Sequence, residues 1–70
     1  KTFSIAHPSS MAASLARALR RYRIRASITQ AELAALVGVD VGTVARWERA
    51  VSHPTRTARR AIEAATGIVA

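Results

Sequence analysis

The spacing of apolar residues along the chain predicts an all-α fold. Apolar side chains recur every three or four positions, which is the period of a helix with one buried side. Residues 1–8 lack this period and end at a proline, so we expect a flexible N-terminal arm there. Residues 9–70 are expected to form a compact bundle of four short helices. The predicted helices span about residues 10–25, 30–37, 41–50 and 56–66.

Residues that commonly begin or end helices support these boundaries. Ser9 or Ser10 is expected to cap the first helix with its hydroxyl. Thr29 and Glu32 have the spacing of a capping box at the start of the second. Glycines and capping side chains mark the other boundaries, which we assign to Gly38, Asp40, Thr55 or Thr57, and Gly67. His53-Pro54 is expected to end the segment that contains the third helix.

The periodicity also predicts which side chains form the core. Half of the residues are hydrophobic, but 16 of these 35 are alanine, so the larger apolar side chains suffice for one small core. Ile28 is expected to plug the gap between the first two helices. The predicted inward residues are Met11, Leu15, Leu19, Tyr22, Leu33, Leu36, Val37, Val44, Trp47, Glu48, Val51, Ala58, Ala61, Ile62 and Ala65.

The third helix is predicted to expose a small, basic surface. At about 100° per residue, Trp47, Glu48 and Val51 fall within about 60° of Val44 and form its inward side. The opposite side carries no acidic residue and consists of Gly42, Ala45, Arg46 and Arg49. Only two residues separate the expected end of the second helix from the cap of the third. Two helices joined by so short a turn must cross steeply, which is the geometry of a helix-turn-helix unit.

The charge of the chain favours a polyanionic partner. Eleven Lys and Arg residues against four Asp and Glu residues give a net charge of +7 and a pI near 11.8. Ten of the eleven bases are arginine, whose planar guanidinium suits phosphates and guanine edges. We therefore favour nucleic acid. The alternatives are a basic protein that charge repulsion keeps soluble and a basic helix that lies on a membrane surface.

The residue inventory argues against an enzyme. The chain has no cysteine, which excludes disulfides, thiolate zinc sites and a cysteine nucleophile. His7 and His53 have no ligand partners at metal spacing, so we expect neither a metal nor a cofactor. The acids lie one per segment and form no catalytic pair: Glu32, Asp40, Glu48 and Glu63. Three aromatic residues are too few for a base-stacking platform. No apolar run approaches the roughly 18 residues needed to cross a bilayer, and we expect a soluble intracellular protein.

Two segments of the sequence resemble a known family. The run T-Q-A-E-L-A-A-L-V-G-V over residues 29–39, followed by T-V-A-R-W-E over residues 43–48, resembles the Cro/CI-type (XRE-like) helix-turn-helix domain of phage repressors. The resemblance covers about residues 15–68. It implies a lambda-repressor-like domain whose third helix enters the major groove of double-stranded DNA while the second crosses the backbone. It also implies a bacterial or phage-derived protein of the cytoplasm, associated with the nucleoid.

The same resemblance assigns roles to individual positions. Arg23 matches an arginine of the first helix that pairs with a glutamate of the third, here Glu48. The residues expected to face bases are Val41, Gly42, Thr43 and Arg46. The residues expected to contact phosphates are Thr29, Gln30, Arg49, His53 and Arg56. Two departures from the family pattern are Ala50, where relatives usually have glycine, and the polar residues Arg56, Arg59 and Thr66 at apolar positions of the fourth helix.

These observations predict a transcriptional regulator that binds specific DNA sequences. Binding is expected to act by blocking or recruiting RNA polymerase, with two copies of the chain on paired half-sites. An alternative is a protein-interaction module that uses the same scaffold to contact an acidic partner such as a polymerase subunit.

Overall fold

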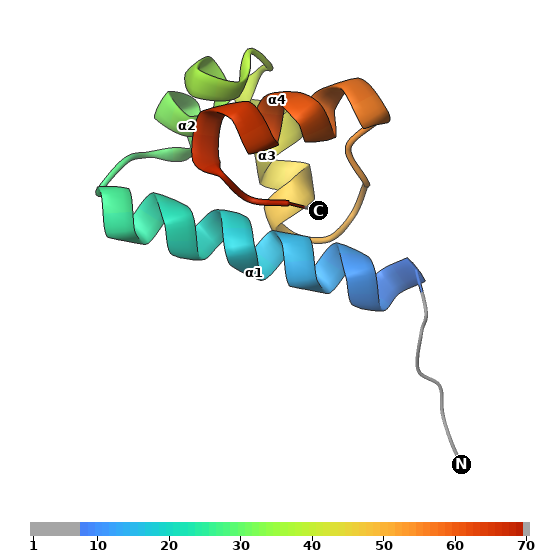
Figure 1. Cartoon of the computed structure of the whole chain (residues 1–70). Helices are drawn as coiled ribbons and strands as arrows, with labels where there is room; N and C mark the ends of the chain where they lie inside the picture. Colours follow the sequence, from blue (N-terminus) through green and yellow to red (C-terminus); the bar gives the residue numbers. More distant parts are fainter. Residues whose placement is uncertain (1–7, 70) are drawn as a thin grey trace.

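The computed structural model describes residues 8–69, which form four helices and no strand. Figure 1 shows the longest helix lying along one side of the other three. The all-α prediction with four helices is therefore confirmed. The predicted arm falls, apart from Pro8, outside the described residues. The helices are α1 (Pro8–Ala26), α2 (Gln30–Val37), α3 (Val41–Glu48) and α4 (Arg56–Thr66).

Two helix boundaries differ from the prediction. Helix α1 begins at Pro8, so Ser9 and Ser10 lie inside it and the predicted serine cap is wrong. Proline fits this position because the first turn of a helix needs no backbone N–H and its ring fixes a helical φ. Helix α3 ends at Glu48 rather than near residue 50, because Ala50 has a φ of 58°, which a right-handed helix does not contain.

The other predicted caps are present. The Thr29 hydroxyl accepts a hydrogen bond from the Glu32 N–H at 3.0 Å, and the Glu32 carboxylate accepts one from the Thr29 N–H at 2.8 Å. This reciprocal pair is a complete capping box. Asp40 and Thr55 cap α3 and α4 with their side chains, which accept hydrogen bonds from the N–H groups of Thr43 and Ala58. Helices α2 and α4 end at the left-handed residues Gly38 and Gly67, with φ of 90° and 81°.

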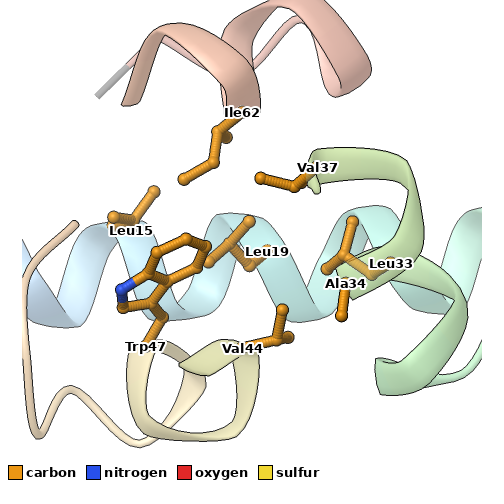
Figure 2. Packing of buried hydrophobic residues seen from close by; sticks show 8 residues of the cluster. All are labelled: Leu15, Leu19, Leu33, Ala34, Val37, Val44, Trp47 and Ile62. Carbon is orange, nitrogen blue, oxygen red and sulfur yellow. The ribbon is translucent and has the colours of Figure 1, made fainter. Parts of the chain in front are cut away.

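The buried side chains form one cluster between the helices (Figure 2). Leu19, Leu33, Val44 and Ile62 expose no surface, and Trp47 lies among them. Most of the predicted core is therefore confirmed. The side chain of the predicted core residue Met11 lies outside the part that the structure describes. Other predicted residues are half-buried and pack against the cluster: Tyr22, Ile28, Ala58, Ala61 and Ala65.

Two predicted core residues are wrong. Leu36 is 55% exposed and Val51 is 62% exposed. The buried arc of α2 is centred on Val37, with Ala34 about 60° to one side and Leu36 about 100° to the other. A buried alanine at that point leaves room for a neighbouring helix to approach closely. Val51 follows the left-handed Ala50, so the 100° step of the helix no longer applies to it.

Two neighbouring helices fix the position of α3. Helix α3 packs against both α1 and α2, and its Val44 and Trp47 side chains point into the core, as Figure 2 shows. The turn between α2 and α3 contains only residues 38–40. Helix α3 is therefore fixed in orientation and keeps one long side free of the protein core.

Candidate nucleic-acid interface

The free side of α3 carries small residues and basic ones. Val41, Arg46 and Arg49 are exposed, and Gly42, Thr43 and Ala45 are half-exposed. All four residues predicted to face bases (Val41, Gly42, Thr43 and Arg46) therefore lie on this surface. An α-helix fits the major groove of B-DNA, where base edges display their donors and acceptors.

A chain of hydrogen bonds runs along the first turns of this surface. The Thr43 hydroxyl donates to Oδ1 of Asp40 at 2.6 Å, and the Thr43 N–H donates to Oδ2 at 3.1 Å. The Arg46 guanidinium donates through Nη2 to Oγ1 of Thr43 at 3.2 Å. The pKa of Asp40 is lowered, chiefly by the Thr43 hydroxyl, then by the Thr43 N–H, with a smaller contribution from the Arg46 charge. Asp40 is therefore ionised at neutral pH and accepts from the residues that follow it.

An ion pair between the half-buried Arg23 and the buried Glu48 joins α1 to α3. Arg23 donates to both carboxylate oxygens of Glu48, through Nε at 2.7 Å and through Nη2 at 2.9 Å. Burial raises the pKa of Glu48, but the hydrogen bonds from Arg23 and Gln30 outweigh it, so the pKa lies below its ordinary value. The hydrogen bond from Glu48 likewise raises the pKa of Arg23. The predicted contact between the first and third helices is present.

Gln30 joins this pair instead of standing free at the surface. Its amide Nε2 donates to Oε1 of Glu48 at 3.1 Å. An amide nitrogen carries two hydrogens, so one remains for a phosphate oxygen. The side chain is thus held at the start of α2 by the ion pair between α1 and α3. Sequence reasoning gave Gln30 a role with phosphate but did not foresee that Glu48 would orient it.

The other residues predicted to contact phosphates lie at both ends of the helix-turn-helix. Thr29 is exposed at the start of α2, where its hydroxyl also serves the capping box. Arg49, His53 and Arg56 are exposed and follow one another along the connection from α3 into α4. Their cationic or polar groups are therefore available to a polyanion after α3.

A second basic surface lies on α1. Four exposed arginines and one exposed isoleucine surround a shallow hollow on this helix: Arg17, Arg20, Arg21, Ile24 and Arg25.

The described residues offer little else in the way of chemistry. Residues 8–69 contain no group of three or more His, Asp or Glu side chains that could hold a metal ion. None of the helices that they form is both long and apolar enough to cross a membrane. An apolar pocket between α1, α4 and the segments flanking α4 is lined by residues that include His53 and Arg59 but no carboxylate.

Comparison with protein families decides the meaning of this architecture. A family model described as "Helix-turn-helix" matches residues 19–68. The chain belongs to the Cro/CI-type helix-turn-helix family. This family consists of DNA-binding regulators that are generally not enzymes, so the chain contains a DNA-binding helix-turn-helix domain. Neither the comparison with curated proteins nor that with solved structures found a match.

One residue of this helix-turn-helix surface was assigned only a capping role from the sequence. Asp40 was expected to begin α3, yet its carboxylate also accepts the hydroxyl of Thr43, which in turn accepts the guanidinium of Arg46. The signal was the spacing of residues 40, 43 and 46, three apart on one helix. This spacing places neighbouring side chains within contact distance.

Proposed function

We propose that this helix-turn-helix domain binds specific double-stranded DNA sequences and regulates transcription. Helix α3 enters the major groove, and its free side meets the base edges. The observation that carries the proposal is the arrangement of α3 itself. Val44 and Trp47 fix one side of α3 in the core, while Arg46, with small neighbours at Gly42 and Ala45, stands on the other.

Arg46 supplies the main direct contact to a base. A guanidinium can donate two parallel hydrogen bonds to O6 and N7 of guanine, the commonest specific contact in the major groove. Thr43 supplies a hydroxyl, and Val41 offers an apolar group to a thymine methyl. Gly42 and Ala45 contribute no donors or acceptors, but their small size lets the helix approach the bases closely.

Phosphate contacts position α3 in the groove. Thr29 and Gln30 at the start of α2 meet one strand of the backbone, and Arg49, His53 and Arg56 meet the backbone after α3. Phosphate contacts supply affinity and register without reading sequence. The net charge of +7 adds a long-range attraction to DNA.

Binding in solution tests this function directly. A mobility shift with a randomised pool of duplexes, followed by sequencing of the bound fraction, identifies any preferred sequence. Arg46→Ala is expected to abolish the preference at one guanine. Arg60→Ala is the matched control, because it removes the same charge from the exposed side of α4. No enrichment of any sequence by the unchanged protein would refute sequence-specific binding.

A second candidate partner is favoured by the arginines of α1. Arg17, Arg20, Arg21 and Arg25 form a separate basic surface around the exposed Ile24, which suits an acidic protein such as a subunit of RNA polymerase. Arginine is enriched in protein–protein interfaces, which supports a protein partner for this surface. Arg21→Glu should then abolish binding to purified polymerase and leave DNA binding in place. Loss of DNA binding alone would assign the surface to DNA.

A further inference from the structure

The hydrogen bonds of Asp40, Thr43 and Arg46 have a direction. A threonine hydroxyl has one hydrogen, and in this structure it donates that hydrogen to Oδ1 of Asp40 at 2.6 Å. The hydroxyl oxygen is then left as an acceptor, and Nη2 of Arg46 donates to it at 3.2 Å. The carboxylate is itself fixed to the start of α3 by the Thr43 N–H at 3.1 Å. Hydrogen bonds therefore link the Thr43 N–H to the Asp40 carboxylate, this carboxylate to the Thr43 hydroxyl, and this hydroxyl to the Arg46 guanidinium.

The direction of helical side chains explains how Arg46 reaches Thr43. Side chains of an α-helix lean toward its N-terminus, so a long side chain covers the turn before its own Cα. Arg46 accordingly lies over the first turns of α3. This places its donors near the start of the helix, although its Cα lies farther along.

Gly42 leaves the space that this arrangement occupies. A Cβ atom at position 42 would stand 3.0 Å from Oδ2 of Asp40 and 3.5 Å from Nη1 of Arg46. The first distance is tighter than ordinary van der Waals contact. The carboxylate and the guanidinium thus flank a position where any other residue would place an atom.

We infer that Asp40, acting through the Thr43 hydroxyl, is a positioning residue that sets where Arg46 meets a base. The inference rests on the proposed function. A guanidinium held in one place loses less conformational freedom on binding and reaches one base rather than several, which favours discrimination. The carboxylate is at the same time an anion on a surface that meets phosphates. The charge of Asp40 therefore lowers affinity for all duplexes, while its positioning of Arg46 raises selectivity at one base.

Asp40→Asn tests this division of roles without removing the cap. Asparagine caps helices about as well as aspartate, so α3 is expected to form as before. The ideal probe is the best duplex from the randomised selection, together with its three single-base variants at the guanine that Arg46 reads. Loss of an exposed charge should tighten the binding of the three variant duplexes by about 2- to 5-fold. Loss of positioning should cancel this gain on the guanine duplex, so the preference for guanine is expected to fall by about the same factor, which is part of the full value of an arginine contact.

A matched control separates the carboxylate's position from its charge. Glu63→Gln removes one negative charge from the exposed side of α4. It should leave the preference for guanine unchanged. A capping role alone for Asp40 predicts that Asp40→Asn behaves like this control, and that result would overturn the inference.

A measurement on the free protein removes the dependence on DNA. NMR can measure how fast the guanidinium of Arg46 rotates about its Cζ–Nε bond. This rotation should be slow in the unchanged protein. It should be faster in Asp40→Asn and in Thr43→Val, which keeps the shape of the side chain but lacks the hydroxyl. Equal rotation in all three proteins would overturn the inference even if DNA binding is specific. If the unchanged protein binds all duplexes equally while its Arg46 rotation is slow, the proposed function fails instead.

Discussion

The guanidinium of Arg23 holds the carboxylate of Glu48 with two hydrogen bonds, 2.7 Å and 2.9 Å long, across 25 positions of the chain. A third hydrogen bond, from Gln30, reaches the same carboxylate at 3.1 Å. One carboxylate on α3 is therefore shared by α1 and by the first residue of α2. This contact fixes the orientation of α3 relative to α1 and α2.

The two partners of this ion pair should differ in what their removal costs. Glu48 is only 3% exposed, whereas the Arg23 side chain is 21% exposed. Arg23→Met strands a buried charge and should lower the free energy of unfolding by about 3–5 kcal/mol. Glu48→Gln leaves an arginine that can reach water, and the loss should be about 1–3 kcal/mol. Urea unfolding measures both. A larger loss for Glu48→Gln would show that Arg23, not Glu48, depends on its partner.

The stability of the domain should fall in acid because of the same carboxylate. The pKa of Glu48 in the folded state lies below its ordinary value of 4.5. As the pH drops, the unfolded chain therefore takes up a proton before the folded one does. The stabilisation is complete above the ordinary pKa and is lost as the pH falls through the lower, folded pKa. Urea unfolding between pH 7 and 3 should show this loss, and Glu48→Gln should make the curve flatter. An unchanged curve in that variant would assign the acid sensitivity to other groups.

Ala50 is expected to be a site where glycine stabilises the fold. Its φ of 58° is in the left-handed region, which costs a residue with a Cβ about 1–2 kcal/mol. Ala50→Gly should raise the free energy of unfolding by about 0.5–1 kcal/mol, net of the flexibility that glycine adds to the unfolded chain. Ala64→Gly, on the exposed side of α4, is the control and should lower it by about 1 kcal/mol. Thermal unfolding of the two variants should therefore shift in opposite directions.

The sequence contained enough local information to predict most of the fold. Capping residues such as Thr29 and Asp40 and glycines such as Gly38 act within a few positions, so their effects are visible in the sequence. The exposed Leu36 shows the limit of this reasoning. Whether α2 buries Leu36 or Ala34 depends on where the neighbouring helices lie, which is a property of the packed domain.

The candidate site likewise has features that the sequence predicts and features that depend on the packed domain. Periodicity alone predicted that Arg46 lies opposite Val44. The pairing of Arg23 with Glu48 came from the resemblance to a family, because 25 positions separate them. The hydrogen bond from Gln30 to Glu48 was not predicted, since it requires three helices to meet at one carboxylate. The spacing of Thr43 and Arg46 places their side chains within reach of each other, but it does not select this conformation among those that a long arginine side chain can adopt.

The affinity for DNA should fall steeply as salt rises. If roughly four to six phosphates are neutralised, the logarithm of the binding constant should fall with the logarithm of the salt concentration with a slope of about −4 to −5. Arg49→Ala and Arg56→Ala should each make this slope shallower by about 1, because each removes one phosphate contact. The slope can be measured by fluorescence anisotropy on a labelled duplex. A binding constant unaffected between low and physiological salt would contradict DNA binding through these residues.

High-affinity binding should require two copies of the domain on one duplex. The free side of α3 offers side-chain hydrogen bonds only from Thr43 and Arg46 among the residues predicted to face bases. A bidentate contact between arginine and guanine discriminates by about 1–3 kcal/mol, whereas specific binding typically exceeds non-specific binding by about 4–10 kcal/mol. One copy therefore falls short, and sequence-dependent DNA shape supplies only part of the difference. Sequences selected from a random pool should contain two half-sites with centres about 10 base pairs, or a multiple of that, apart. Sedimentation of the complex should give two protein chains per duplex, and Arg46→Ala should erase the preference at one guanine in each half-site. Tight, selective binding of a single copy to an isolated half-site would show that α3 reads more bases than Thr43 and Arg46 can account for.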